Sequence, residues 1–341
     1  MLLVYPLALA GLLALPACGG SDADPGKPGD KRITVYSGRG ESLVKPVIDK
    51  FQESTGITVD VRYGSTAQMA AQLTEEGSKS PADVFFAQDA GALGAVAKAG
   101  LFAPLPADVL GKVPQTYRSR SGQWVGVSGR SRVLAYNSDL IAKDTLPASV
   151  FDLTGPQWKG KVGVAPTNAS FQAFVTALRV QHGDAKAKEF LTGLKANEPQ
   201  IRDGNVQIVA DVNAGKIAVG LVNHYYIYEL AKEKGVTADQ LTVKLHFFPG
   251  GDTGALVNVA GVGILAKSAA DPDARAFAEY LLGTEAQTHF ATQTHEYPLI
   301  AGVPNPAGLP TLDGLAAPKI DLNDLDTLAA SVAMIKEAGL A

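Results

Sequence analysis

The chain has 341 residues, of which 46 % are hydrophobic and 19 % charged, with a formal net charge of -4 at pH 7. This length exceeds what one hydrophobic core ordinarily supports and is typical of two lobes of roughly 150 residues each. The charge shows no basic excess, which argues against a nucleic-acid surface. The composition predicts a soluble globular body.

The N-terminal segment predicts export and lipid attachment. Residues 2–17 are apolar and uncharged but too short to span a membrane comfortably, and they end at the only cysteine, Cys18. We expect residues 1–17 to be a lipoprotein signal peptide, with Cys18 as the lipidated first residue of the mature protein. Residues 18–30 are rich in Gly, Pro, Ser and Asp and predict a flexible tether. A buried free thiol is the alternative, but this sequence offers no core for one.

The first structured part alternates strands and helices. Strands are expected at 32–36, 57–61 and 81–87, and helices over 43–51 and 66–76, from apolar residues at the matching periods. Such alternation predicts an α/β fold with a mostly parallel sheet covered by helices on both faces.

The extended run over 124–137 is far longer than a typical strand. A run of this length can belong to two sheets, so we place a hinge within it. A second long run, 256–265, is expected to return the chain to the first lobe.

A second strand–helix unit follows the hinge. Its expected elements are strand 162–164, helices 170–181, 185–195 and 205–214, strand 216–222, and a C-terminal helix over 325–335 that closes the second lobe. The predicted N-lobe is therefore 31–130 with 258–300, and the predicted C-lobe is 131–257 with 301–341. Two lobes joined by two extended crossings predict a hinge-bending binding protein with its ligand in the cleft.

Two adjacent tyrosines, Tyr225 and Tyr226, follow the last strand of the second lobe. In open α/β sheets, ligands bind at the carboxyl ends of strands, so two phenols there are a potential pair of hard oxygen donors. Packing with satisfied hydroxyls is the more ordinary role of tyrosines.

The turn Gly38-Arg39-Gly40 joins the first strand to the first helix. It matches only part of a dinucleotide-binding fingerprint, because Leu43 stands at the third glycine position. Free backbone N–H groups at a helix start, together with the guanidinium of Arg39, predict an anion site.

Two further segments are open to more than one interpretation. The segment 167–170 precedes a helix and caps it, and it also offers N–H and hydroxyl donors to an anion. The segment 129–132 is either a charged hinge surface or part of a site. No convincing catalytic set is present, and the histidines show no metal-ligand spacing. We therefore expect no enzyme activity.

Several stretches together resemble the bacterial ferric-ion-binding proteins of ABC iron importers, the bacterial transferrins, over essentially the whole mature chain. The stretches that carry this resemblance are 33–38, 81–86, 128–133, 158–163, 223–226 and 296–299. The resemblance implies a type II periplasmic-binding-protein fold and a monomeric, extracytoplasmic protein, which the signal ending at Cys18 is expected to anchor by lipid. It also implies delivery of ferric iron to a permease in the cytoplasmic membrane.

In that family the adjacent tyrosines are ferric ligands, which carries over to Tyr225 and Tyr226. Some members add a histidine and a glutamate, but this chain has Arg39 in the turn and Gln88 beside Asp89 at the other position. The resemblance therefore implies a third tyrosine ligand, Tyr136, and a synergistic carbonate or phosphate held by Arg39. The further anion-binding positions that it implies are Asn168, Ala169, Ser170, Asn205 and Asn223.

This assignment agrees with the chemistry of the ion. Ferric ion favours anionic oxygen donors, and coordinated phenols ionise. A synergistic anion would bring negative charge into a closed cleft, and Arg39 could balance it. The competing interpretation is a related protein whose aromatic walls enclose an organic cation such as thiamine or a polyamine, for which Asp89 is the one plausible acidic partner.

Overall fold

The computed structural model describes residues 30–341, and the predicted signal peptide, Cys18 and most of the tether lie outside them. The described strands are β1 (Arg32–Ser37), β2 (Thr58–Tyr63), β3 (Val84–Ala87), β4 (Val125–Asn137), β5 (Val162–Val164), β6 (Gln200–Ile201), β7 (Val219–Asn223), β8 (Val243–His246), β9 (Val257–Ile264) and β10 (Tyr297–Pro298). The described α-helices are α1 (Glu41–Thr55), α2 (Thr66–Glu76), α3 (Ala90–Lys98), α4 (Ala107–Leu110), α5 (Ala169–Ala196), α6 (Asn205–Asn213), α7 (Tyr226–Lys234), α8 (Pro272–Leu281), α9 (Thr284–Gln293) and α10 (Leu328–Glu337).

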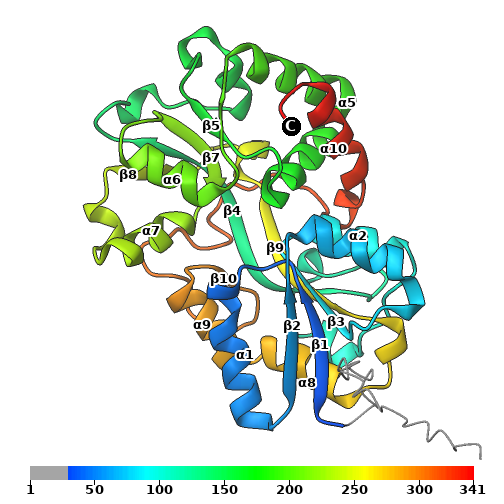
Figure 1. Cartoon of the computed structure of the whole chain (residues 1–341). Helices are drawn as coiled ribbons and strands as arrows, with labels where there is room; N and C mark the ends of the chain where they lie inside the picture. Colours follow the sequence, from blue (N-terminus) through cyan, green and yellow to red (C-terminus); the bar gives the residue numbers. More distant parts are fainter. Residues whose placement is uncertain (1–29) are drawn as a thin grey trace, which may run out of the picture.

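These elements form two lobes that share the long strand β4 (Figure 1). The strand order is β2-β1-β3-β9-β4-β7-β5-β6, with β8 and β10 also paired to β4. Residues Val125 to Ser131 of β4 pair with β9, and residues Arg132 to Tyr136 pair with β7. The strand therefore changes sheets between Ser131 and Arg132, within the run where the sequence predicts a hinge.

In the N-lobe, β1 lies between its parallel neighbours β2 and β3, while β9 returns antiparallel to β3. Helix α1 buries one stripe of apolar side chains, Val44, Val47, Ile48 and Phe51, which is the spacing expected of an amphipathic helix. The capping box of Ser65 and Gln68 fixes the start of α2. Parallel strands that end together bring the β1–α1 and β3–α3 turns to the same edge of the sheet, which faces the other lobe.

In the C-lobe, β7 lies between β5, its parallel neighbour, and the second half of β4. Helix α5 begins at Ala169 with Asn168 as its cap, and it is broken at Gly183, where the backbone is left-handed with φ 82°. The start of α5, the start of α6 and the end of β7 all reach the edge of this sheet that faces the N-lobe, as Figure 1 shows.

The C-terminal segment corrects one part of the predicted division into lobes. Residues 301–341 were expected to belong to the C-lobe, and α10 does pack there, with Ser331 Oγ 2.7 Å from Thr176 Oγ1 of α5. However, Leu322 and Leu325 are buried in the core of the N-lobe, and Arg120 of that lobe pairs with Asp321 at 2.8 Å. The tail therefore contacts both lobes. Among residues 30–341, no helix is long and apolar enough to cross a membrane.

Candidate functional site

The tyrosine pair lies where β7 ends and α7 begins. Strand β7 is buried throughout, and its direction carries Tyr225 and Tyr226 toward the N-lobe. The two rings lie 4.2 Å apart between centroids, and the side chain of Tyr225 is completely buried. Its hydroxyl has no hydrogen-bond partner among the described residues, and burial raises the pKa of Tyr225 well above its ordinary value. The phenol of Tyr225 is therefore protonated near pH 7 and has no polar partner among the described residues.

His224 fixes the turn that carries the pair. Its Nδ1 accepts a hydrogen bond from the backbone N–H of Ser131 at the hinge (3.2 Å), and its Nε2 donates to the carbonyl of His295 (2.7 Å). Burial lowers the pKa of His224 to about 4, so the ring is neutral near pH 7. His224 thus has both ring nitrogens occupied and acts as a structural support for the tyrosines.

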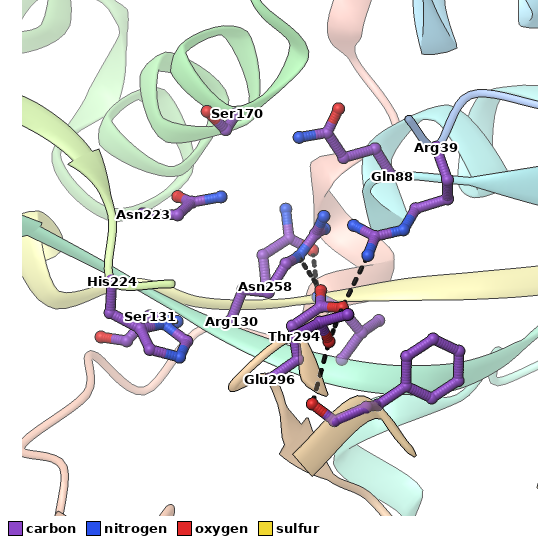
Figure 2. A network of polar contacts seen from close by, with 12 residues as sticks. Arg39, Gln88, Arg130, Ser131, Ser170, Asn223, His224, Asn258, Thr294 and Glu296 are labelled. Carbon is purple, nitrogen blue, oxygen red and sulfur yellow. Dashed lines mark hydrogen bonds and ion pairs between the residues drawn. The ribbon is translucent and has the colours of Figure 1, made fainter. Parts of the chain in front are cut away.

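Arg39 enters the cleft from the N-lobe. The turn that carries it is tight, because a Cβ atom at Gly38 would lie 2.2 Å from Thr66 Oγ1. Thr66 donates to the carbonyl of Gly38 (3.0 Å) and accepts from the backbone N–H of Gln88 (3.2 Å), which joins the ends of β1 and β3. Figure 2 shows the side chains of Arg39 and Gln88 side by side at this edge of the cleft.

Arg39 forms a buried ion pair with Glu296. Its Nη2 donates to Glu296 Oε2 at 2.6 Å, and the two side chains are 1 % and 0 % exposed. Arg130, on β4, lies on the other side of this carboxylate, with its Nε 3.9 Å from Glu296 Oε1. Burial lowers the pKa of Arg130, and the charge of Arg39 lowers it further. Two N–H groups of each arginine, Nε and Nη1, have no partner among the described residues.

Arg132 is the centre of the C-lobe part of the site. Its Nη1 donates to Ser170 Oγ (3.0 Å) and lies 3.5 Å from Asn223 Oδ1, while its Nε has no partner in the described chain. Asn205 donates to Ser170 Oγ (3.0 Å) and to Asn168 Oδ1 (3.2 Å). Burial lowers the pKa of Arg132 to about 10, and the nearby tyrosines oppose that shift.

The predicted anion-binding positions are thus brought together in space. Asn168, Ser170, Asn205 and Asn223 form one hydrogen-bonded group around Arg132, and Ala169 is the first residue of α5 beside them. In segment 129–132, Arg130 and Arg132 are buried and do not form a charged surface. In segment 167–170, Asn168 caps α5, and Ser170 also accepts a hydrogen bond from Arg132.

The third tyrosine of the predicted metal set lies elsewhere, which corrects that prediction. Tyr136 pairs with Val219, the first residue of β7, whereas the tyrosine pair follows Asn223 at the other end of that strand. The four steps along the chain from Val219 to Asn223 separate the two ends of β7 by about 13 Å. Tyr136 packs in the C-lobe core with Leu134 and Trp158. It therefore has a core role and does not complete a ligand set with Tyr225 and Tyr226.

Asp89 is also accounted for by structure. Its Oδ1 accepts a hydrogen bond from the backbone N–H of Ala92 (2.9 Å), so it caps α3. Burial raises its pKa. Residues 30–341 contain no group of three or more His, Cys, Asp or Glu side chains that could hold a metal ion.

Glu296 was not identified as a site residue from the sequence. Its partner Arg39 is 257 positions away, and no local pattern marks the pair. The one available signal was its position in a stretch that carries the family resemblance, 296–299.

A cavity of about 790 Å³ lies between the lobes, but neither the three arginines nor Tyr225 and Tyr226 line it. It is lined by α1, α7 and α9. Glu229 of α7 contributes to its wall, and burial raises the pKa of Glu229 to about 7 although Arg39 opposes the shift. Buried guanidinium groups and two phenols close to one another make this group of residues suitable for an anion and a hard cation together.

Comparison with known proteins places the chain. Residues 79–326 match the family model described as bacterial extracellular solute-binding protein. The chain is 35 % identical to the Fe(3+)-binding periplasmic protein of Serratia marcescens, over 98 % of this chain and 97 % of that protein. It is 33 % identical to the major ferric iron-binding protein of Neisseria meningitidis, over 90 % of this chain and 93 % of that protein.

Solved structures give the same result. The iron-bound HitA of Pseudomonas aeruginosa superposes with a TM-score of 0.86 at 36 % identity, covering 91 % of this chain and 99 % of that one. A Trichodesmium protein (IdiA, FutA) in complex with iron and citrate ligands superposes with a TM-score of 0.75 at 28 % identity, covering 91 % and 100 %. The fold is the type II periplasmic-binding-protein fold, as predicted. The chain belongs to the bacterial extracellular solute-binding proteins, and within them to the ferric-iron-binding periplasmic proteins.

Proposed function

We propose that this chain captures ferric iron in the interlobe cleft through the phenolates of Tyr225 and Tyr226, together with an anion held by Arg39, Arg130 and Arg132. The observation that carries the proposal is the buried hydroxyl of Tyr225, which has no hydrogen-bond partner among the described residues. It lies close to Arg39 and Arg130, whose guanidinium N–H groups also include unpartnered ones. Polar groups buried without partners are costly, so a site that keeps several is suited to a ligand that satisfies them.

Charge determines which ligand can satisfy them. Among residues 30–341, the three buried guanidinium groups have between them one ion-pair partner, Glu296, and a ferric ion adds more positive charge than two phenolates remove. A multivalent oxyanion such as carbonate or phosphate would balance that surplus, and its oxygens would accept bidentate pairs of hydrogen bonds from the free N–H groups.

Two protein oxygens occupy only part of a ferric coordination sphere. With Tyr136 in the core, the remaining positions fall to the anion or to water. A chelating anion such as citrate would fill several of them at once, and a related protein in complex with iron and citrate supports this option. The proposed cargo is therefore ferric ion with a chelating or synergistic oxyanion.

The proposed cellular role is delivery of iron to an ABC importer permease in the cytoplasmic membrane. The hinge in β4 allows the lobes to close over the cargo and to open again at the permease. The Serratia marcescens relative is named as a periplasmic protein, and we propose that this chain works as a monomer outside the cytoplasm, anchored by lipid at Cys18. We propose no enzymatic activity.

The competing function, binding of thiamine, a polyamine or a similar organic cation, has less support. An organic cation would need carboxylates in the cleft, but Asp89 caps α3 and Glu296 is paired with Arg39. Three buried arginines would repel it, and unlike a ferric ion it would not ionise the two tyrosines to offset that repulsion.

The test is to titrate iron-free protein with ferric ion in the presence of bicarbonate, phosphate or citrate and to record visible spectra. Coordinated tyrosinates should produce a charge-transfer band that saturates at one iron per chain, and the double variant Tyr225→Phe/Tyr226→Phe should give none. Absence of the band with all three anions, in protein shown to be folded, would refute the proposal.

A further inference from the structure

Glu296 lies in the loop between α9 and β10, facing Arg39 and Arg130 from the N-lobe side (Figure 2). We propose that Glu296 is a positioning residue that holds these two arginines with their free N–H groups directed at the anion. This inference rests on the proposed function, because it concerns how the same cleft recognises its oxyanion. It assigns a specificity role to a carboxylate that does not itself contact the cargo.

The loop holds the carboxylate in a fixed place. The backbone N–H of Glu296 donates to the carbonyl of Phe290 (2.9 Å), and Thr294 Oγ1 lies 3.1 Å from Glu296 Oε2. The preceding residue, His295, adopts a left-handed φ of 54°, which is unfavourable for a residue with a side chain. Its ring stacks on Tyr228 with centroids 4.0 Å apart. A strained, stacked and hydrogen-bonded loop gives Glu296 little freedom to move.

Glu296 holds one nitrogen of Arg39 by a hydrogen bond and faces Arg130 at a longer distance, without a hydrogen bond to it. Glu296 Oε2 accepts a hydrogen bond from Arg39 Nη2 at 2.6 Å, which leaves Nε and Nη1 of Arg39 without a partner among the described residues. Its other oxygen, Oε1, lies 3.9 Å from Arg130 Nε and has no hydrogen bond within the described chain. A guanidinium is planar, so fixing one edge also fixes the direction of the remaining N–H groups.

The opposite expectation is that Glu296 only neutralises charge. A negative charge beside the anion site repels the anion, so a pure counter-ion would weaken anion binding, and its removal would strengthen it. A positioning residue predicts the reverse, because loss of the carboxylate frees the arginines to turn away. The two roles therefore differ in the sign of the effect.

The experiment compares Glu296→Gln with the parent. Ferric affinity is measured with and without added bicarbonate, and the ratio of the two affinities is the anion-assisted gain. We expect Glu296→Gln to reduce this gain by about tenfold or more, as for loss of hydrogen bonds to charged groups. In an Arg39→Ala background the same substitution should reduce it markedly less, because Glu296 acts partly through Arg39. An unchanged or increased gain in Glu296→Gln would overturn the inference.

Asp83→Asn is the matched control. Asp83 is also a largely buried carboxylate of the N-lobe, and it pairs with Lys267 at 3.0 Å away from the cleft. The substitution Asp83→Asn should leave the anion-assisted gain unchanged even if it lowers the stability of the protein. If Glu296→Gln does not fold, Thr294→Val takes its place, because it removes the hydroxyl beside the carboxylate and keeps every charge. A reduced anion-assisted gain in Thr294→Val would support the inference, and an unchanged gain would contradict it. A parent without any ferric band would overturn the proposed function and this inference together, whereas a parent with an anion-dependent band isolates the role of Glu296.

Discussion

Replacing Tyr225 by phenylalanine should strengthen the iron-free protein and weaken its binding of iron. The substitution removes one oxygen and keeps the ring, which is completely buried and packs on Tyr226. The hydroxyl that is lost has no hydrogen-bond partner among residues 30–341. The two effects therefore have opposite signs and come from the same atom.

The gain in stability follows from desolvation. A buried polar group without a partner costs about 1 to 3 kcal/mol, so the free energy of unfolding of the iron-free variant should rise by roughly 1 kcal/mol or more. The loss of affinity follows from coordination chemistry. Removal of residues that only support a metal ligand already costs about 10- to 100-fold, and loss of the ligand itself should exceed about 100-fold.

The pH dependence gives an independent readout. Because burial raises the pKa of Tyr225, the phenol is protonated near pH 7 and must release its proton to bind iron. Ferric affinity should therefore rise with pH, and Tyr225→Phe should release about one proton fewer per bound iron.

The assays are urea unfolding of iron-free protein and ferric titration at several pH values. Tyr136→Phe is the matched control, since it removes a phenol oxygen in the C-lobe core and should leave ferric affinity and the visible band unchanged. A Tyr225→Phe variant that is less stable without iron, or that keeps the parent's affinity, would refute this reasoning.

Three further substitutions have defined outcomes. Arg39→Lys should keep the ion pair with Glu296 but lose the bidentate fork, so ferric iron should be removed faster by a competing chelator than from the parent, and equal removal rates would contradict this. Burial raises the pKa of Glu229 from 4.5 to about 7, so its contribution to stability is complete below about pH 4.5 and is lost as pH rises through 7. Between pH 5 and pH 8 the parent should therefore lose stability that Glu229→Gln keeps. Urea unfolding at the two pH values should show a difference between the two proteins of on the order of 3 kcal/mol at most. Cys18→Ser, outside the described residues, should abolish incorporation of labelled lipid in the native host, and a mature N-terminus at another residue would count against lipidation at Cys18.

Local patterns predicted most of the elements. The strands and helices of both lobes follow the hydrophobic periods, and the gap between the two expected helices 170–181 and 185–195 corresponds to the break at Gly183. The turn with Arg39 and the tyrosine pair could be located because each directly follows a buried strand. In these cases the relevant information lies within about ten residues of chain.

The errors concern relations between distant segments. Tyr136 was expected at the cleft, but alternation along a strand indicates which face a side chain takes and says nothing of its depth; the pairing with Val219 decides the depth. The ion pair of Arg39 and Glu296 joins two turns from opposite ends of the chain, so no local pattern could predict it. The position of Leu325 in the N-lobe core depends in the same way on tertiary packing.

The C-terminal tail has a mechanical consequence for the movement of the lobes. Its beginning is fixed to the N-lobe by Leu322, Leu325 and the pair of Arg120 with Asp321, and α10 is fixed to α5 in the C-lobe. Only a few residues separate these two attachments, so they cannot move far apart without one of them detaching. The tail therefore acts as a strap that limits the angle to which the cleft can open, and shortening or loosening it should change how readily cargo escapes.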